Sequence, residues 1–284
     1  MKRLLLLCVG LLAAMTLHAS DASDSLAMQR AKRTKLKLKG AVGYTMNVKV
    51  GHYRQQITMI TLSPGAFSAR LVLSNELTPT SFSGERLSAE FGVNAGFWSR
   101  GEIPSTYIRI DGEEQSETLG FQHTRVNGVV ELDDDAFDIS ECAPSRYKEL
   151  KSKTILASGP LLIDDGRMFD YRHKTEGKDA HPGVVRFYNG RHPRTVIGRN
   201  ANGDIVLMVV DGRFEGLSEG VTIAELAKVC RWLGMVDALN LDGGGSTTMW
   251  TRYEGVVNHP CDNRTFDHEG ERAVLSSILF LRRR

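Results

Sequence analysis

Two apolar runs, each ending in Asp-Gly, constrain the fold of this chain more than any other feature. Residues 204–210 are almost entirely apolar and lead into Asp211, and residues 236–241 lead into Asp242 in the same way. A continuous apolar run is typical of a strand that is covered on both faces. Each run therefore predicts a buried strand that delivers a carboxylate to its end.

A helix is predicted between the two runs. Thr222 and Glu225 form a capping box, apolar residues then recur at helical spacing, and Gly234 is a stop signal. The unit is strand, helix, strand, and the right-handed crossover rule favours parallel strands. We therefore expect the Asp211 and Asp242 carboxylates to emerge at the same edge of one sheet and to share a cleft.

The first twenty residues have the order of a secretory signal peptide. Lys2 and Arg3 precede an apolar run from Leu4 to Leu17, and small and polar residues follow it. The run is shorter than the ~20 residues that a helix needs to cross a bilayer, so we expect no stable membrane span after cleavage. Residues 1–20 are interpreted as a signal peptide, and the protein as exported, either periplasmic or secreted.

The charge balance argues against a nucleic-acid partner. The chain has 36 Lys and Arg residues against 34 Asp and Glu, and the leader contains two of the basic ones, so the mature chain is close to neutral. The one basic run, residues 30–39, alternates with Leu and Thr and predicts an edge strand or a tether.

No internal repeat or linker divides the rest of the chain. We expect a β-rich segment over residues 21–90 and a site-bearing region over 91–284, which is continuous with 41–90 as one domain. The fold class is α+β or mixed α/β, with a mixed β-sheet core. Residues 99–150 are expected to be exposed strands and loops. Residues 164–190 are expected to be a long charged loop, which is either a lid or rim or a mobile surface excursion.

Three cysteines remain after export. Cys230 falls on the apolar side of the predicted helix and is expected to be a buried thiol. This leaves Cys142 and Cys261 as a possible disulfide pair, which the sequence cannot establish.

Asp211 and Asp242 form the best carboxylate pair in the chain. Glycosyl transfer needs one group that assists the leaving oxygen and another that attacks or activates water. A phosphate leaving group needs less protonation, so cationic side chains could take over part of this work. Arg194 and Arg213 are the candidates, because a guanidinium matches phosphate oxygens, although a surface ion pair is the commoner role of an arginine.

Three glycines, Gly243 to Gly245, follow Asp242. Bare backbone there suits either a ligand that approaches main-chain amides or a flexible turn, and the hydroxyls of Ser246 and Thr247 follow. The two Asp-Gly loops could also hold a structural calcium or magnesium ion, although no cofactor is required by this interpretation. The histidines are scattered without a zinc-binding pattern, so no catalytic metal is expected.

Five ordered blocks of the sequence resemble the phosphodiester glycosidase domain family. They are Asn94-Ala95-Gly96-Phe97, Gly159-Pro160, His192-Pro193-Arg194-Thr195, Val210-Asp211-Gly212-Arg213 and Asn240-Leu241-Asp242-Gly243-Gly244-Gly245-Ser246-Thr247. The resemblance implies removal of a sugar such as N-acetylglucosamine from a phosphodiester. The catalytic candidates are Asp211, Asp242, Arg194 and Arg213, and the substrate-binding candidates are Asn94, Gly96, Thr195, Gly243, Gly244, Gly245, Ser246 and Thr247.

The function expected from these observations is an exported glycosidase. It would hydrolyse a small-molecule or glycan sugar-1-phosphodiester, such as an exopolysaccharide component, to free sugar and a phosphomonoester. Two alternatives stay open: a non-catalytic binding module for phosphorylated surface polysaccharide, and a metal-dependent phosphodiesterase.

Overall fold

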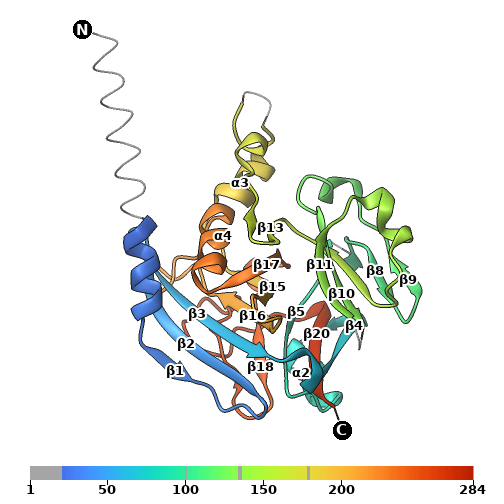
Figure 1. The fold of residues 1–284 in the computed structure, drawn as a ribbon, viewed down its shortest axis with the longest axis horizontal. Coiled ribbons are helices and arrows are strands. Elements are labelled where there is room, and N and C mark those ends of the chain that lie inside the picture. Colours follow the sequence, from blue (N-terminus) through green and yellow to red (C-terminus); the bar gives the residue numbers. More distant parts are fainter. Residues whose placement is uncertain (1–20, 100, 134–135, 178–179, 284) are drawn as a thin grey trace.

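The largest element of the fold is an eight-stranded sheet. The computed structural model describes residues 21–99, 101–133, 136–177 and 180–283 (Figure 1), so the predicted signal peptide lies outside the described residues. In order across the sheet, its strands are β1 (Arg33–Lys35), β2 (Ala41–Val50), β3 (Tyr53–Leu62), β16 (Ile205–Val210), β15 (Arg194–Asn200), β17 (Met235–Asn240), β13 (Leu161–Asp164) and β14 (Arg167–Met168). The basic run thus contains an edge strand, β1.

The two strands that end in Asp-Gly run in the same direction. Both pair antiparallel with β15, which lies between them, so β16 and β17 are parallel without being neighbours. A mixed sheet was expected, but every strand pairing among the described residues is antiparallel. The α+β fold class itself is confirmed. The predicted common edge is also confirmed, because two strands flanking an antiparallel neighbour end on the same side.

Both faces of β16 are buried, which explains its continuous apolar sequence. Leu207 and Val209 point into a core shared with the other sheets, and Met208 and Val210 point into a core shared with the helices. On the helical face lie residues 21–30, α3 (Pro182–Asn189) and α4 (Ile223–Trp232). The predicted capping box of α4 is present in both directions.

Two five-stranded sheets cover the opposite face. One has the order β11 (Ala136–Glu141), β10 (Gly128–Asp133), β12 (Ile155–Ser158), β8 (Ile108–Ile110) and β9 (Glu113–Ser116). The other has the order β19 (Gly255–Val256), β18 (Met249–Thr251), β5 (Phe91–Asn94), β20 (Val274–Arg282) and β4 (Phe67–Thr78). The short elements are β6 (Trp98–Ser99), β7 (Ile103–Pro104), α2 (Thr80–Arg86), η1 (Pro64–Ala66), η2 (Gly120–Gln122), η3 (Pro144–Glu149), η4 (Arg172–Lys174) and η5 (Gly244–Ser246).

Two sequence-based expectations are wrong, and one question that the sequence left open is answered. Residues 99–150 are not mainly exposed, because Ile108, Val130 and Leu132 pack into the central core. Residues 164–190 are not one long loop, since β14, η4 and α3 lie within them. Cys142 and Cys261 are both free thiols, as is the buried Cys230, so the possible disulfide is not formed. Across the described ranges, no helix is long and apolar enough to cross a membrane.

The Phe91 ring is at the centre of the packing between β5, β4 and β20. It is fully buried, and its centroid lies 5.0 Å from that of Phe67 and 5.6 Å from that of Phe280. Phe91→Ala should lower the free energy of unfolding by about 3–5 kcal/mol through lost burial and a cavity. Phe82→Ala, at a side chain that is 56% exposed, is the control and should cost less than about 0.5 kcal/mol. Urea denaturation of both variants checks this, and equal losses would contradict it.

Candidate active site

Asp211 is buried at the end of β16 and is fully occupied by internal hydrogen bonds. Its side chain is 1% exposed. Asn258 Nδ2 donates to Oδ1 at 2.9 Å, and the backbone N and ring Nδ1 of His259 donate to Oδ2 at 3.1 and 2.9 Å. A carboxylate enclosed in this way cannot reach a substrate directly. What it does is hold the imidazole of His259.

His259 is the functional candidate that the sequence reasoning missed. Its side chain is 16% exposed, and its ring is stacked parallel to that of Phe266 at 3.9 Å between centroids. Because Nδ1 donates to Asp211, the neutral ring carries its lone pair on Nε2, where it can accept a proton. No local pattern in the sequence links His259 to Asp211, which is 48 residues away.

Asp242, at the end of β17, has a different environment from Asp211. It is only half-buried, and its Oδ1 accepts a hydrogen bond from Gly243 N at 2.9 Å. Loss of hydration raises the pKa of Asp242 to about 6, against the opposing effects of a hydrogen bond from Ser246 and the charges of Arg272 and Arg125. Asp242 is therefore the carboxylate of the pair that a ligand can reach.

The three glycines after Asp242 lie close to neighbouring protein groups, and the contact at Gly243 is with backbone. A Cβ on Gly243 would lie 2.7 Å from Pro193 O, and one on Gly245 would lie 2.3 Å from the Arg272 guanidinium. Gly244 has φ +65° and lies against Arg213. The loop is thus packed against two arginines and the chain before β15, and the flexible-turn interpretation does not fit it.

The remaining predicted binding residues are buried behind the glycine loop and contact other protein groups. Asn94 is fully buried, donates from Nδ2 to Asp242 O at 2.6 Å, and accepts from Thr195 Oγ1 at 2.7 Å. Gly96 leaves no room for a side chain and donates its N–H to Ser276 Oγ. The side chains of Thr195, Ser246 and Thr247 are at most 1% exposed.

The two predicted phosphate ligands lie in different surroundings. Arg213 is exposed, has φ +70°, and donates from Nη1 to Cys261 Sγ at 3.5 Å. Arg194 is 2% exposed and donates to three backbone carbonyls: from Nε to Val221 O, and from Nη2 to Phe187 O and Gly190 O. Burial, followed by the charges of Arg125 and Arg213, lowers the pKa of Arg194 to about 9.

Arg125 and Arg272 complete the charged surroundings of Asp242 and were not predicted. Arg272 is paired with Asp262 at 2.6 Å. Within the described parts of the chain, Arg125, Arg194 and Arg213 form no ion pair with a carboxylate. The charges of Arg125 and Arg272 act on Asp242, and the Arg213 guanidinium lies against Gly244 of the same loop. Because Arg125, Arg194 and Arg213 have no acid partner, the site carries net positive charge and favours an anion.

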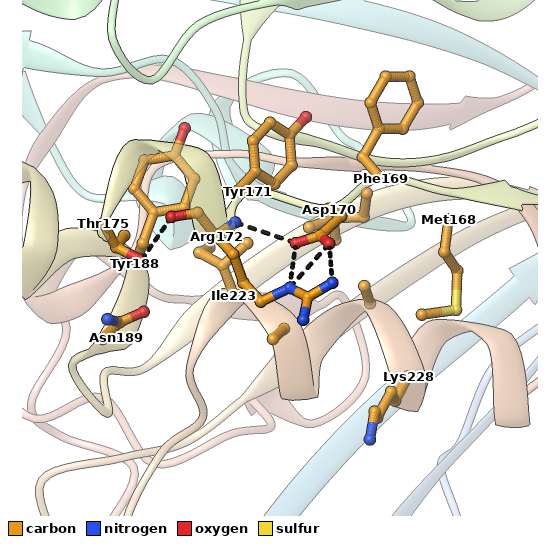
Figure 2. A pocket seen from close by; sticks show the side chains of 13 residues that line it. Met168, Phe169, Asp170, Tyr171, Arg172, Thr175, Tyr188, Asn189, Ile223 and Lys228 are labelled. Atoms are coloured by element: carbon orange, nitrogen blue, oxygen red, sulfur yellow. Dashed lines mark hydrogen bonds and ion pairs between the residues drawn. The ribbon is translucent and has the colours of Figure 1, made fainter. Parts of the chain in front are cut away.

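A separate cavity of about 310 Å³ opens between α3, α4 and the segment after β14 (Figure 2). Tyr171, Tyr188 and Ile223 contribute to its walls, and Arg172 forms a bidentate pair with Asp170 at its rim. None of the predicted site residues lines this cavity. No cluster of His, Cys, Asp and Glu among residues 21–99, 101–133, 136–177 and 180–283 is arranged to hold a metal ion.

The fold and the site together define a β-rich α+β protein with a reachable carboxylate, an oriented imidazole and arginines without acid partners near the ends of β16 and β17. The family model for phosphodiester glycosidases matches residues 88–281 of the chain. The chain belongs to the phosphodiester glycosidase family.

Several known proteins are similar to this chain. Bovine (Bos taurus) N-acetylglucosamine-1-phosphodiester alpha-N-acetylglucosaminidase is 41% identical over 94 residues, which are 33% of this chain and 17% of that protein. The SPbeta prophage-derived uncharacterized protein YomE of Bacillus subtilis (strain 168) is 35% identical over 199 residues, 68% of this chain and 28% of that protein. The matches thus span less than a third of either relative. The fold is shared with the zebrafish N-acetylglucosamine-1-phosphodiester alpha-N-acetylglucosaminidase catalytic domain, at a TM-score of 0.68, 15% identity and 88% coverage of both chains.

Because the pKa of Asp242 is raised, replacing this carboxyl group by the uncharged amide of asparagine should stabilise the protein in a pH-dependent way. The folded protein holds this proton up to about pH 6, whereas the carboxyl group has an ordinary pKa of 3.8, so wild-type stability falls as the pH rises through that window. Asp242→Asn should therefore be more stable than wild type by roughly 2 kcal/mol at about pH 8 and by almost nothing at about pH 4.

Urea unfolding at the two pH values tests this expectation. Asp165→Asn, at an exposed carboxylate far along the sheet from the loop, is the control and should change stability by less than about 0.5 kcal/mol at either pH. A loss of stability in Asp242→Asn at the higher pH would show that its ionised form is stabilised by the fold.

Proposed function

We propose that the protein hydrolyses a sugar-1-phosphodiester between the anomeric carbon and its oxygen, releasing free sugar and a phosphomonoester. The observation that carries this proposal is a reachable carboxylate with a raised pKa, Asp242, near arginines that have no acid partner. The sugar assigned is N-acetylglucosamine-like, since that sugar appears in the names of the bovine and zebrafish relatives.

The two aspartates have different roles in this proposal. Asp211 is a positioning residue, because both of its oxygens are engaged by Asn258 and His259. Asp242 faces the anomeric carbon and stabilises the positive charge that develops there, or attacks it. His259 Nε2 accepts the proton of the water that adds to this carbon. The departing phosphate needs no proton, because the arginines stabilise its charge.

We also propose that the protein is exported, works without a metal and acts on glycan phosphodiesters outside the cytoplasm. The support for export is the order of residues 1–20, with basic, apolar and then small polar side chains. Expression of the full chain with N-terminal analysis of the product tests the cleavage, and activity in the presence of a chelator tests the metal requirement.

Hydrolysis in oxygen-18 water tests the reaction itself. With an N-acetylglucosamine-1-phosphodiester as substrate, the label should enter the sugar, because the carbon–oxygen bond breaks, and Asp242→Asn should lose at least about a hundredfold in kcat. Label in the phosphomonoester instead would identify a phosphodiesterase. Tight binding without release of either product would identify a binding module, and both results would contradict the proposal.

The Asp211–His259 pair should control the proton-transfer step of the proposed reaction. His259→Gln is expected to lower kcat by roughly 10²–10⁴ with little change in KM, because the proton acceptor is lost while the binding groups remain. Asp211→Asn should also lower kcat, since the imidazole loses its acceptor at Nδ1. His52→Gln, at an exposed histidine, is the control. Activity of His259→Gln within about tenfold of wild type would exclude the acceptor role.

A further inference from the structure

Arg125 and Arg194 share one aromatic ring. Arg125 Cζ lies 4.6 Å from the centroid of Phe187, and Arg194 Cζ lies 5.3 Å from it. Phe187 is on α3, and its ring also contacts Phe97 at 6.2 Å between centroids. Phe97 follows directly on the Asn94-Ala95-Gly96 block. Two positive charges are thus held together by an apolar ring, next to the loop that carries Asp242.

The position of Arg125 is fixed by its backbone. Its N–H donates to Gln122 O at 2.8 Å. Its carbonyl oxygen lies 2.3 Å from the place that a Cβ on Gly159 would occupy, so Gly159 has to be glycine for the two segments to pack. The side chain makes one long hydrogen bond, from Nη2 to Gly183 O at 3.5 Å. Its buried Nε has no acceptor among the described residues.

The charge of this pair is not balanced by a nearby acid. The carboxylate that attracts Arg125 at longer range is Asp242, and the one that attracts Arg194 is Glu225. Glu225, however, is already paired with Arg191. Burial lowers the pKa of both Arg125 and Arg194, which means that their charged forms are poorly solvated. A bound anion would offset this cost.

We propose that Arg125 forms an anion site on the Phe187 ring and holds a non-bridging oxygen of the substrate phosphate, while the buried Arg194 adds positive charge from behind the same ring. This rests on the proposed function for the identity of the anion. Arg125 is the added member, since it lies outside every sequence block that resembles the family. Arg213, which is exposed beside Gly244, then reaches the phosphate from the solvent side.

Arg125 could act only as a counter-ion of Asp242, and the experiment has to distinguish that role from anion binding. As a counter-ion of Asp242 alone, Arg125 would lower the pKa of that carboxyl group without contributing to anion binding. Its loss would then move the pH profile of kcat and leave phosphate affinity unchanged. Phosphate affinity measured without turnover distinguishes the two roles.

The experiment compares Arg125→Gln, Arg125→Lys and Arg172→Gln with wild type by calorimetric titration of inorganic phosphate, together with steady-state kinetics on the phosphodiester. Arg172 is an exposed arginine beside the separate cavity, paired with Asp170 (Figure 2), and serves as the matched control. Arg125→Gln should weaken phosphate binding by at least about tenfold and raise KM more than it lowers kcat. Arg125→Lys should recover only part of this affinity, because an ammonium lacks the planar fork.

Two results would overturn the anion site. One is wild-type phosphate affinity in Arg125→Gln, with or without a shifted pH profile. The other, which decides the matter if Arg125→Gln does not fold, is wild-type affinity in Arg125→Lys. If wild type binds phosphate through Arg125 but releases no sugar, the anion site stands and the proposed glycosidase function fails. If sugar is released and Arg125→Gln retains its KM, the function stands and the anion site is wrong.

Discussion

The buried amide of Asn94 is the interaction on which the rest of the site depends. It joins three segments that are far apart in sequence: β5, which carries it, β15 through Thr195, and the glycine loop through the Asp242 carbonyl and the Thr248 N–H. Because the amide is fully buried, each of these hydrogen bonds is made in a low-dielectric interior, and a lost partner would leave a desolvated polar group. The position of the Asp242 loop relative to the eight-stranded sheet is thereby set by a side chain that does not itself reach the solvent.

The hydrogen bond from Asn94 also sets where the glycine loop meets its neighbours. Once Asn94 fixes the loop at its start, the next residues pass the Pro193 backbone at a distance that excludes a Cβ and lie against the Arg213 and Arg272 side chains. Glycine at these positions therefore reflects crowding by the protein, and the arginines that cause the crowding are the groups that make the site positive. Because the loop packs closely against guanidinium groups, its backbone carbonyl and amide groups are oriented before a ligand binds.

Local sequence predicted the parts of this architecture that local physics controls. The capping box at Thr222, the apolar runs that became β16 and β17, and the common edge for Asp211 and Asp242 follow from periodicity and from chain direction. Local sequence could not predict that β15 lies between the two strands, that β8 and β10 pack into the core, or that His259 meets Asp211. Those results depend on pairings over long separations, which periodicity does not encode. Arg125 was missed for the same reason, since its partners, Phe187 and Gly159, come from other elements.

The two aspartates show most clearly what the environment adds to sequence. Both follow a buried strand and precede a glycine, so the local pattern treats them alike. Asp211 accepts three hydrogen bonds and is sealed from solvent, which suits a carboxylate that stays in place and orients a neighbour. Asp242 accepts fewer hydrogen bonds and keeps access to solvent, and desolvation raises its pKa towards neutrality. Two carboxylates whose surroundings differ in this way suit two roles: Asp211 orients a neighbouring side chain, and Asp242 is the candidate for the chemical step. The arginines without acid partners matter for Asp242, because their positive charge offsets the repulsion between this carboxylate and an anionic substrate.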